Sequence, residues 1–132
     1  MKVMLGTDVT SYIFTHRTEN VRRRFLTFAV GDVAISAITA GELVFGFQIT
    51  PSERVRRAVE RALGALKIVP FDRAASEAYG EVRSFLQRRG TPIGPLDMLI
   101  AAHAISLDVP LATNNLREFR RVPGLRVENW LA

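Results

Sequence analysis

Residues 3–8 read Val-Met-Leu-Gly-Thr-Asp, a short apolar run that ends at a glycine and two polar residues. A short apolar run bounded by turn residues is typical of a buried β-strand. Similar runs follow at 33–35, 67–71 and 110–112, with a fifth candidate at 125–127. Helical patterns separate these runs. Short strands that alternate with helices predict an α/β fold, in which helices cover both faces of a parallel sheet.

Two capping motifs predict where helices begin in the first half of the chain. Thr39 and Glu42 have the spacing of a capping box, in which each side chain bonds a free backbone N–H group of the first turn. Thr50 and Glu53 repeat this spacing, and Pro51 between them is favoured in a first helical turn. Two further helices are predicted over 8–14 and 19–28.

The second half of the chain contains the longest and the most apolar helical segments. A helix is predicted over 72–89, because Asp72 is a favoured N-cap and Gly90 is the residue type expected just after a helix. Residues 98–107 are apolar nearly all round, which predicts a central, buried helix. A short helix is predicted near 117–119.

Length and composition limit the class of protein. The chain has 132 residues, so we expect a single domain over 1–132. Without cysteine it cannot form disulfides or thiolate metal sites, and any metal must have oxygen or nitrogen ligands. The first apolar run is shorter than the roughly 7–15 residues of a signal-peptide core, and no run reaches the roughly 18 of a membrane span. We therefore expect a cytoplasmic protein that does not enter membranes.

The net charge of +5 predicts an anionic partner or a solvated basic surface. All the basic residues are arginine except Lys2 and Lys67, and arginine favours two-pronged contacts with phosphate or carboxylate. Nucleic acid and an acidic protein segment both fit this charge. A cluster on the helix after residue 51 leaves the same choice open between RNA phosphates, an acidic partner tail and plain solvation: Arg54, Arg56, Arg57 and Arg61.

Polar residues gather just after the predicted strands. In open α/β sheets, ligands bind beyond the carboxyl ends of the strands. Asp8 and Asn115 follow two of these strands, and Glu42 and Asp97 lie near the starts of the helices that come next. Carboxylates that met at one edge would repel each other unless a cation joined them, and hard oxygen ligands favour Mg²⁺ or Mn²⁺.

Each acid in this group also has a purely structural interpretation. Glu42 could only complete its capping box, Asp97 could only offset a helix dipole, and Asp8 could only be an N-cap. Spacing alone does not choose between these roles and metal binding.

Four segments, taken in order, resemble the VapC branch of the PIN-domain family, and the resemblance extends to Trp130. They are Leu5-Gly6-Thr7-Asp8-Val9-Thr10-Ser11-Tyr12-Ile13, Ile35-Ser36-Ala37-Ile38-Thr39-Ala40-Gly41-Glu42-Leu43, Gly90-Thr91-Pro92-Ile93-Gly94-Pro95-Leu96-Asp97-Met98-Leu99-Ile100-Ala101-Ala102-His103-Ala104, and Leu111-Ala112-Thr113-Asn114-Asn115 with Glu118-Phe119. Each segment is a weak signal, but the ordered set is specific.

The resemblance implies a PIN-like three-layer α/β/α sandwich with a mainly parallel sheet of four to five strands. It also implies a Mg²⁺- or Mn²⁺-dependent endoribonuclease toxin of a type II VapBC-type toxin–antitoxin system. Such a toxin forms a homodimer, is neutralised by a VapB-type antitoxin, and meets DNA only indirectly through that antitoxin.

Site residues carry over by position. Glu42 and Asp97 match the second and third acidic positions, Asn115 matches the fourth, and Asp8 matches the Asn or Asp two residues after the first acid. The resemblance thus implies metal ligands at Asp8, Glu42 and Asp97. Polar supporting positions, some of which would position substrate, are Thr7, Ser36, Thr39 and Thr113.

Gly6 is where this chain departs from the family pattern. The pattern reads Leu-Asp-Thr-Asn or Leu-Asp-Thr-Asp, and here glycine replaces its first aspartate. The change removes one ligand and one negative charge, so we expect weak metal binding and poor RNA cleavage. The alternative is a catalytically inactive module that binds its antitoxin and contributes to an operator-DNA complex. An unrelated nucleotide-binding domain is disfavoured because the chain has no glycine-rich phosphate-binding motif.

Several other residues invite functional roles that we consider secondary. His103 lies within the apolar helix and is expected to be a packed core or interface histidine. Trp130 is expected to be a packing anchor. One candidate apolar surface patch for a partner peptide, with core packing as the alternative, comprises Tyr12, Ile13, Phe45 and Phe47.

Overall fold

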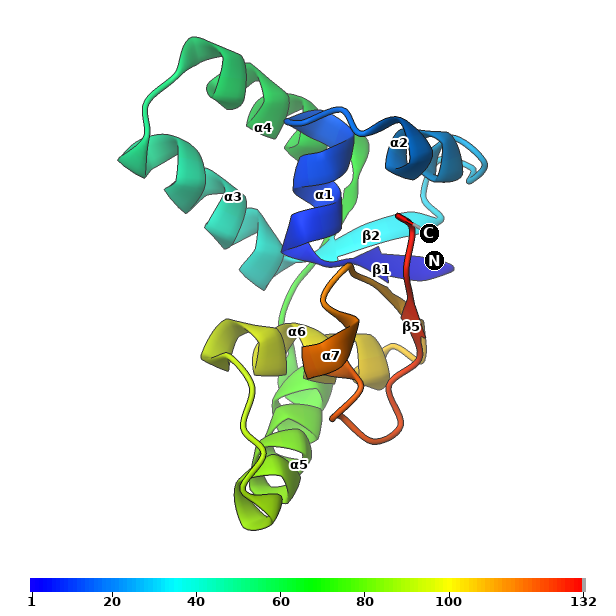
Figure 1. The fold of residues 1–132 in the computed structure, drawn as a ribbon, viewed down its shortest axis with the longest axis vertical. Helices are drawn as coiled ribbons and strands as arrows, with labels where there is room; N and C mark the ends of the chain where they lie inside the picture. The colour runs from blue at the N-terminus through cyan, green and yellow to red at the C-terminus, as the bar shows by residue number, and fades with distance from the viewer. Residues whose placement is uncertain (132) are drawn as a thin grey trace.

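The computed structural model describes residues 1–131, in which helices and strands alternate as the sequence predicts (Figure 1). The strands are β1 (Val3–Leu5), β2 (Val33–Ser36), β3 (Lys67–Val69), β4 (Leu111–Ala112) and β5 (Val127–Glu128). The helices are α1 (Thr7–Phe14), α2 (Glu19–Phe25), α3 (Ala37–Ile49), α4 (Glu53–Ala65), α5 (Arg73–Arg89), α6 (Pro95–Ser106) and α7 (Leu116–Phe119).

All five strands are parallel and lie in the order β3-β2-β1-β4-β5. β1 is central: Met4 pairs with Ala34 of β2 on one side and with Leu111 of β4 on the other. Because the strands are parallel, their carboxyl ends share one edge of the sheet, and the loops that leave this edge are neighbours. The predicted three-layer α/β/α architecture is confirmed.

Alternate residues of each strand face opposite helical layers. Val3 and Leu5 pack into a first core with α1 to α4, whereas Met4, between them, packs into a second core with α5, α6 and α7. Figure 1 shows α1–α4 on one side of the sheet and α5–α7 on the other. Residues 98–107 were predicted to be central, and α6 is indeed buried along most of its length.

The structure corrects two predicted helix starts. α3 begins at Ala37, where the Ser36 hydroxyl accepts a hydrogen bond from Ile38 N at 3.1 Å, so Thr39 does not cap it. α4 begins at Glu53, where Ser52 and not Thr50 is the cap. The first correction matters for function, because Glu42 does not complete a capping box and its carboxylate has another partner.

Smaller differences affect the other ends of the elements. α1 starts at Thr7 with Gly6 in the N-cap position, so Asp8 lies inside the first turn and does not cap it. The last strand is Val127–Glu128, two residues later than the predicted 125–127 at its start. No helix within residues 1–131 is long and apolar enough to cross a membrane.

Candidate active site

The carboxyl edge of the sheet holds a small hollow of about 200 Å³. Residues after β1 and β4 form one part of its wall, and residues from α6 and α7 form the rest. Most of the residues predicted to carry chemistry are in it. The lining comprises Gly6, Thr7, Asp8, Asp97, Ile100, Thr113, Asn115 and Phe119.

The carboxylate of Glu42 is held next to this hollow by a hydroxyl from the neighbouring strand end. Thr7 Oγ1 donates a hydrogen bond to Glu42 Oε1 at 2.7 Å and lies 3.3 Å from Thr39 Oγ1. β1 and β2 are adjacent, so the residues that follow them meet. Thr39 is fully buried, and its hydroxyl contacts this pair instead of capping α3. Thr7 therefore orients Glu42.

Asp8 is held by the end of β4. Its Oδ2 accepts hydrogen bonds from Asn114 N at 2.8 Å and from Thr113 Oγ1 at 3.3 Å, and its Oδ1 accepts one from Val9 N at 2.8 Å. Thr113 is itself buried, and it accepts a bond from Asn115 N at 3.0 Å. These contacts fix the Asp8 carboxylate in the space between β1 and β4, so Thr113 positions Asp8.

Gly6 leaves the space that this arrangement of Asp8 uses. A Cβ atom at position 6 would lie 2.9 Å from Asp8 Oδ1 and 3.2 Å from the backbone oxygen of Ala112. The backbone of Gly6 is extended, with φ −71° and ψ 166°, so its conformation admits any side chain. The restriction is therefore steric: a side chain at position 6 requires the Asp8 carboxylate to move.

Asp97 belongs to a pair with a residue that the sequence reasoning did not place in the site, Glu118. Glu118 Oε1 accepts a hydrogen bond from Gly94 N, its Oε2 accepts one from Asn115 Nδ2, and its carboxyl also bonds that of Asp97. One signal could have revealed Glu118. It lies three residues after Asn115 in a short helix, on the same face.

The pKa of Asp97 shows that several carboxylates lie close together at this site. Burial raises the pKa of Asp97 to about 7, and the carboxylates of Glu118, Glu42 and Asp8 add to the shift. Asp97 thus senses all three of the other acids, which places Glu42 and Asp97 on the same side of the molecule. The nuclease hypothesis depends on that condition.

Glu118 shifts in the opposite direction. Burial favours its neutral form, but hydrogen bonds from Gly94 N, Asp97 and Asn115 outweigh burial and lower its pKa. The proton of the pair therefore resides on Asp97, which donates it to Glu118.

The chemistry of the donors fits a divalent cation, although the side chains are engaged with protein groups. Within residues 1–131, no three histidine, aspartate or glutamate side chains are arranged to hold a metal ion. Asp8 is turned toward β4, Glu42 toward Thr7 and Asp97 toward Glu118. All of these donors are hard oxygen atoms, as Mg²⁺ and Mn²⁺ prefer. Burial is the largest cause of the raised pKa of Asp97, and the neighbouring carboxylates add a repulsion that a cation would neutralise.

Ser36 does not fit its predicted role in positioning substrate. It is fully buried, and its hydroxyl caps α3 while lying 2.8 Å from His103 Nδ1. His103 is a packed core histidine, as expected, and the ring of Phe71 meets it edge-on at 5.2 Å. Burial lowers the pKa of His103, although Asp72 and the carbonyl of Pro70 act in the opposite direction. Ser36 and His103 thus join α3 to α6 beneath the site.

Of the remaining candidates, Trp130 has its predicted role and the apolar patch does not form. Trp130 is 4% exposed and stacks on Phe28, so it is a packing anchor as predicted. The proposed apolar patch does not form as a unit, because Tyr12, Ile13 and Phe47 pack on the core and only Phe45 is exposed.

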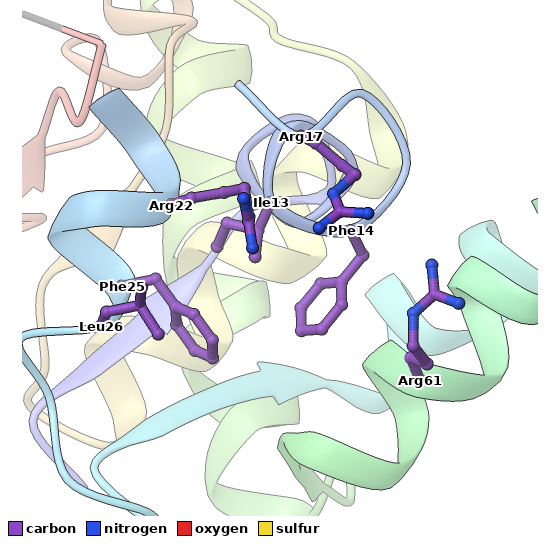
Figure 2. Close-up of a pocket in the computed structure, with 7 residues that line it drawn as sticks. All are labelled: Ile13, Phe14, Arg17, Arg22, Phe25, Leu26 and Arg61. Carbon is purple, nitrogen blue, oxygen red and sulfur yellow. The ribbon is translucent and has the colours of Figure 1, made fainter. Parts of the chain in front are cut away.

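The arginines of the α4 cluster have different partners. Arg56 and Arg57 pair with glutamates of their own helix, and Arg54 reaches the backbone oxygen of Thr15. Arg61 instead faces a hollow of about 440 Å³ between α1, α2 and α4. Figure 2 shows the rings of Phe14 and Phe25 toward this hollow and three guanidinium groups around it.

Comparison with known proteins identifies the family of this chain. The PIN domain family matches residues 3–125. The chain is 39% identical over 132 residues to the tRNA(fMet)-specific endonuclease VapC of Salmonella typhimurium, and the match covers 98% of each chain. It is 36% identical to ribonuclease VapC2 of Haemophilus influenzae over 99% of each chain.

Solved structures give the same result. The crystal structure of VapBC2 from Rickettsia felis bound to a promoter DNA fragment contains a chain with a TM-score of 0.92 and 35% identity, covering 98% of this chain and 99% of that one. DNA-bound VapBC from Salmonella typhimurium matches with a TM-score of 0.87 and 37% identity over 98% of each chain. Fold and sequence together place this chain in the PIN-domain family, among the VapC toxin ribonucleases.

Proposed function

We propose that this chain is the toxin of a type II, VapBC-type toxin–antitoxin pair and cleaves RNA with the help of Mg²⁺ or Mn²⁺. The observation that carries the proposal is the convergence of Asp8, Glu42, Asp97 and Glu118 at one edge of the sheet, where the pKa of Asp97 rises to about 7. Such a concentration of carboxylates favours a divalent cation, and the relatives that share the whole length of the chain are ribonucleases.

The side chains have distinct tasks in this mechanism. Asp8, Glu42 and Asp97 would hold the ion, which when bound lowers the pKa of a water molecule and neutralises charge on the phosphodiester. Thr7 fixes the carboxylate of Glu42, and Thr113 fixes that of Asp8. Glu118 accepts the proton of Asp97 and orients the amide of Asn115, which lines the hollow.

The activity of this chain would be weakened by Gly6, because one acid of the family pattern is missing. The direct test is Mn²⁺ affinity, measured by electron paramagnetic resonance, together with cleavage of RNA. Gly6→Asp should improve both, but its Cβ meets Asp8 Oδ1 at 2.9 Å. We therefore expect Gly6→Asp to gain Mn²⁺ affinity only if the Asp8 carboxylate moves aside. The double variant Gly6→Asp/Asp8→Ala has no carboxylate at position 8 to move, so its Mn²⁺ affinity shows what the acid at position 6 contributes without that contact.

The results separate the two candidate functions. Metal-dependent cleavage that is lost in Glu42→Gln establishes the nuclease. A protein that binds its antitoxin but cleaves no RNA, alone or as either position-6 variant, is the inactive module, whose complex would still reach operator DNA through the antitoxin. If neither variant gains Mn²⁺ affinity, Gly6 is not the defect.

The VapB-type antitoxin would dock in the hollow shown in Figure 2. Ile13, Phe14, Phe25 and Leu26 form an apolar lining, and Arg17, Arg22 and Arg61 surround it. An apolar lining with guanidinium groups around it suits a peptide that carries apolar side chains next to carboxylates. Arg61→Glu should weaken binding of the antitoxin encoded beside this gene at least tenfold. Arg57→Glu is the matched control, because Arg57 lies on the same helix but pairs with Glu53 outside the hollow.

A homodimer is also proposed, with α3 as its contact surface. Val44, Phe45 and Ile49 are large apolar residues that α3 leaves exposed. Contiguous exposed apolar surface of this kind is typical of protein–protein contacts.

A further inference from the structure

Helix α2 (Glu19–Phe25) separates two hollows of different character. Arg22, Phe25 and Leu26 line the apolar hollow of Figure 2. On the other side of the helix is a second hollow of about 570 Å³, lined by Asn20, Arg23, Arg24 and Thr27 and closed by the last residue of β5 and the two residues after it. The residues contributed by the chain end are Glu128, Asn129 and Trp130.

The second hollow has hydrogen-bond donors and a larger polar lining than the first hollow. Asn20 and Arg23 of α2 and Thr27, just after it, have exposed side chains, and the one large apolar residue of this lining, Trp130, is buried against Phe28. A purely apolar peptide segment would leave these polar side chains without partners. A polar chain of repeated negative charge would find donors along the length of the hollow.

Arg24 is held in place across this hollow. Its guanidinium lies 5.7 Å from the ring centroid of Phe28 and 5.9 Å from that of Trp130, and 3.8 Å from a carboxylate oxygen of Glu128. Arg23 lies 3.6 Å from Glu19. Both ion pairs are long and solvent-exposed, so they are weak and leave N–H groups free for a phosphate.

The hollow adjoins the acidic site. Glu128 of β5 pairs with Ala112 of β4, and Thr113 N donates a hydrogen bond to Glu128 O at 2.9 Å. Thr113 lines the acidic hollow and Glu128 lines the second one, so residues joined by a backbone hydrogen bond contribute to both hollows. A nucleic-acid strand bound at the carboxylates can reach Arg23 and Arg24 by crossing β5.

We infer that the hollow between α2 and the segment after β5 binds the sugar–phosphate backbone of the RNA next to the cleavage site, with Arg23 and Arg24 on phosphates and Asn20 as a hydrogen-bonding partner. This inference rests on the proposed nuclease function. Charge and position favour RNA over an acidic protein segment, which would be better accommodated by the apolar lining on the other side of α2.

The test measures RNA binding without cleavage. Full-length protein in EDTA is titrated into fluorescently labelled initiator tRNA, the RNA for which the Salmonella typhimurium relative is named, and anisotropy is recorded between about 50 and 200 mM salt. Arg23→Ala should weaken binding several-fold and reduce the slope of log affinity against log salt by about one. Arg22→Ala, the adjacent residue on the other side of the helix, is the matched control and should change the slope less.

Asn20→Asp provides a second variant that preserves folding. An aspartate in the first turn of α2 favours the helix dipole, so the protein should be at least as stable as the wild type while repelling phosphate. Equal RNA affinity for wild type, Arg23→Ala and Asn20→Asp would overturn the inference and leave the nuclease intact. A wild type that retains no RNA would overturn both.

Antitoxin binding supplies the remaining discrimination. If Arg23→Ala and Asn20→Asp weaken the antitoxin complex and leave RNA binding unchanged, the hollow is a protein contact and the inference is wrong. If they weaken RNA binding while Arg22→Ala weakens antitoxin binding, the two sides of α2 have the separate roles proposed here.

Discussion

The two helical layers of the sheet differ in how completely they bury their apolar residues. In the layer of α5, α6 and α7, side chains such as Leu86 and Ile100 are 1% exposed, and Leu96 is the one large hydrophobic residue exposed on these helices. In the layer of α1 to α4, Phe45 and Ile49 are 62% and 65% exposed, and the residue after α2, Leu26, is 72% exposed.

The difference indicates that the two helical layers have different roles. The α5–α7 layer is a scaffold whose apolar surface is used within the chain, whereas the α1–α4 layer keeps apolar surface for other molecules. The acidic site lies between the two layers. Asp97 and Glu118 come from the α5–α7 layer, and Asp8 and Glu42 come from the α1–α4 layer. A partner that binds the α1–α4 layer would therefore contact the layer that holds Asp8 and Glu42.

The largest expected effect tests this difference through stability. Leu86→Ala should lower the free energy of unfolding by about 2–5 kcal/mol, because it leaves a cavity in the second core. Ile49→Ala should change it by less than about 0.5 kcal/mol, because the side chain is exposed. Urea unfolding of both variants at low protein concentration gives the comparison. Equal losses would mean that the α1–α4 surface is part of the monomer's own stability.

A smaller effect is expected where the layers are joined. Ser36→Ala removes the cap of α3 and the hydroxyl next to His103, so it should cost about 1–2 kcal/mol. Ser52→Ala removes a longer cap bond of 3.4 Å on α4 and serves as the control, with an expected loss nearer 0.5 kcal/mol. The same urea titrations measure both. A Ser36→Ala loss no larger than the control would show that the buried contact with His103 is energetically neutral.

The acidic site should destabilise the fold at alkaline pH. The pKa of Asp97 rises from 3.8 unfolded to about 7 folded, so between these values the native state holds a proton that the unfolded chain does not. That stabilisation is complete below about pH 4 and is lost as pH rises through 7. Asp97→Asn should therefore increase the free energy of unfolding at pH 8 by about 1 kcal/mol, after discounting for solvent and for the shared proton with Glu118.

The control for this variant is the same measurement at about pH 4, where aspartate is largely protonated in both states and the gain should nearly vanish. A stabilisation that is independent of pH would assign the effect to packing and remove the argument for crowded charge.

The smallest effect on stability should accompany a change in assembly. Phe45→Ser should leave unfolding almost unchanged while lowering the apparent mass in light scattering from dimer to monomer, because the exposed ring of α3 is proposed to contact a second copy. Leu96→Ser, on the other layer and also exposed, is the control and should not alter the mass. A Phe45→Ser protein that remains dimeric places the dimer contact elsewhere.

Sequence pattern predicted the order of elements better than their ends. Both corrected helix starts involve neighbouring serine and threonine residues, each able to cap, and the tertiary structure selected Ser36 and Ser52. At Ser36 the choice follows from strand alternation. Ile35 faces the α1–α4 core, so the next residue faces α6, where His103 lies. That alternation could also have shown that Ser36 is buried and does not position substrate.

The candidate site was predicted as a set of positions but not as a set of contacts. Asp8, Glu42, Asp97 and Asn115 follow from the rule that loops at the carboxyl edge meet. The turn of Asp8 toward β4 depends on the space left by Gly6 and on the backbone of Asn114, which no spacing rule describes. Glu118 was missed because its importance arises from a carboxylate 21 positions earlier in the chain, Asp97.

The contact between position 6 and Asp8 also constrains how this protein could change over generations. A single base change converts a glycine codon into an aspartate codon, yet here the new side chain would meet a carboxylate fastened by three hydrogen bonds. Positions 6 and 8 are therefore coupled: the effect of a substitution at one of them depends on the residue at the other, and their separate effects are not expected to add.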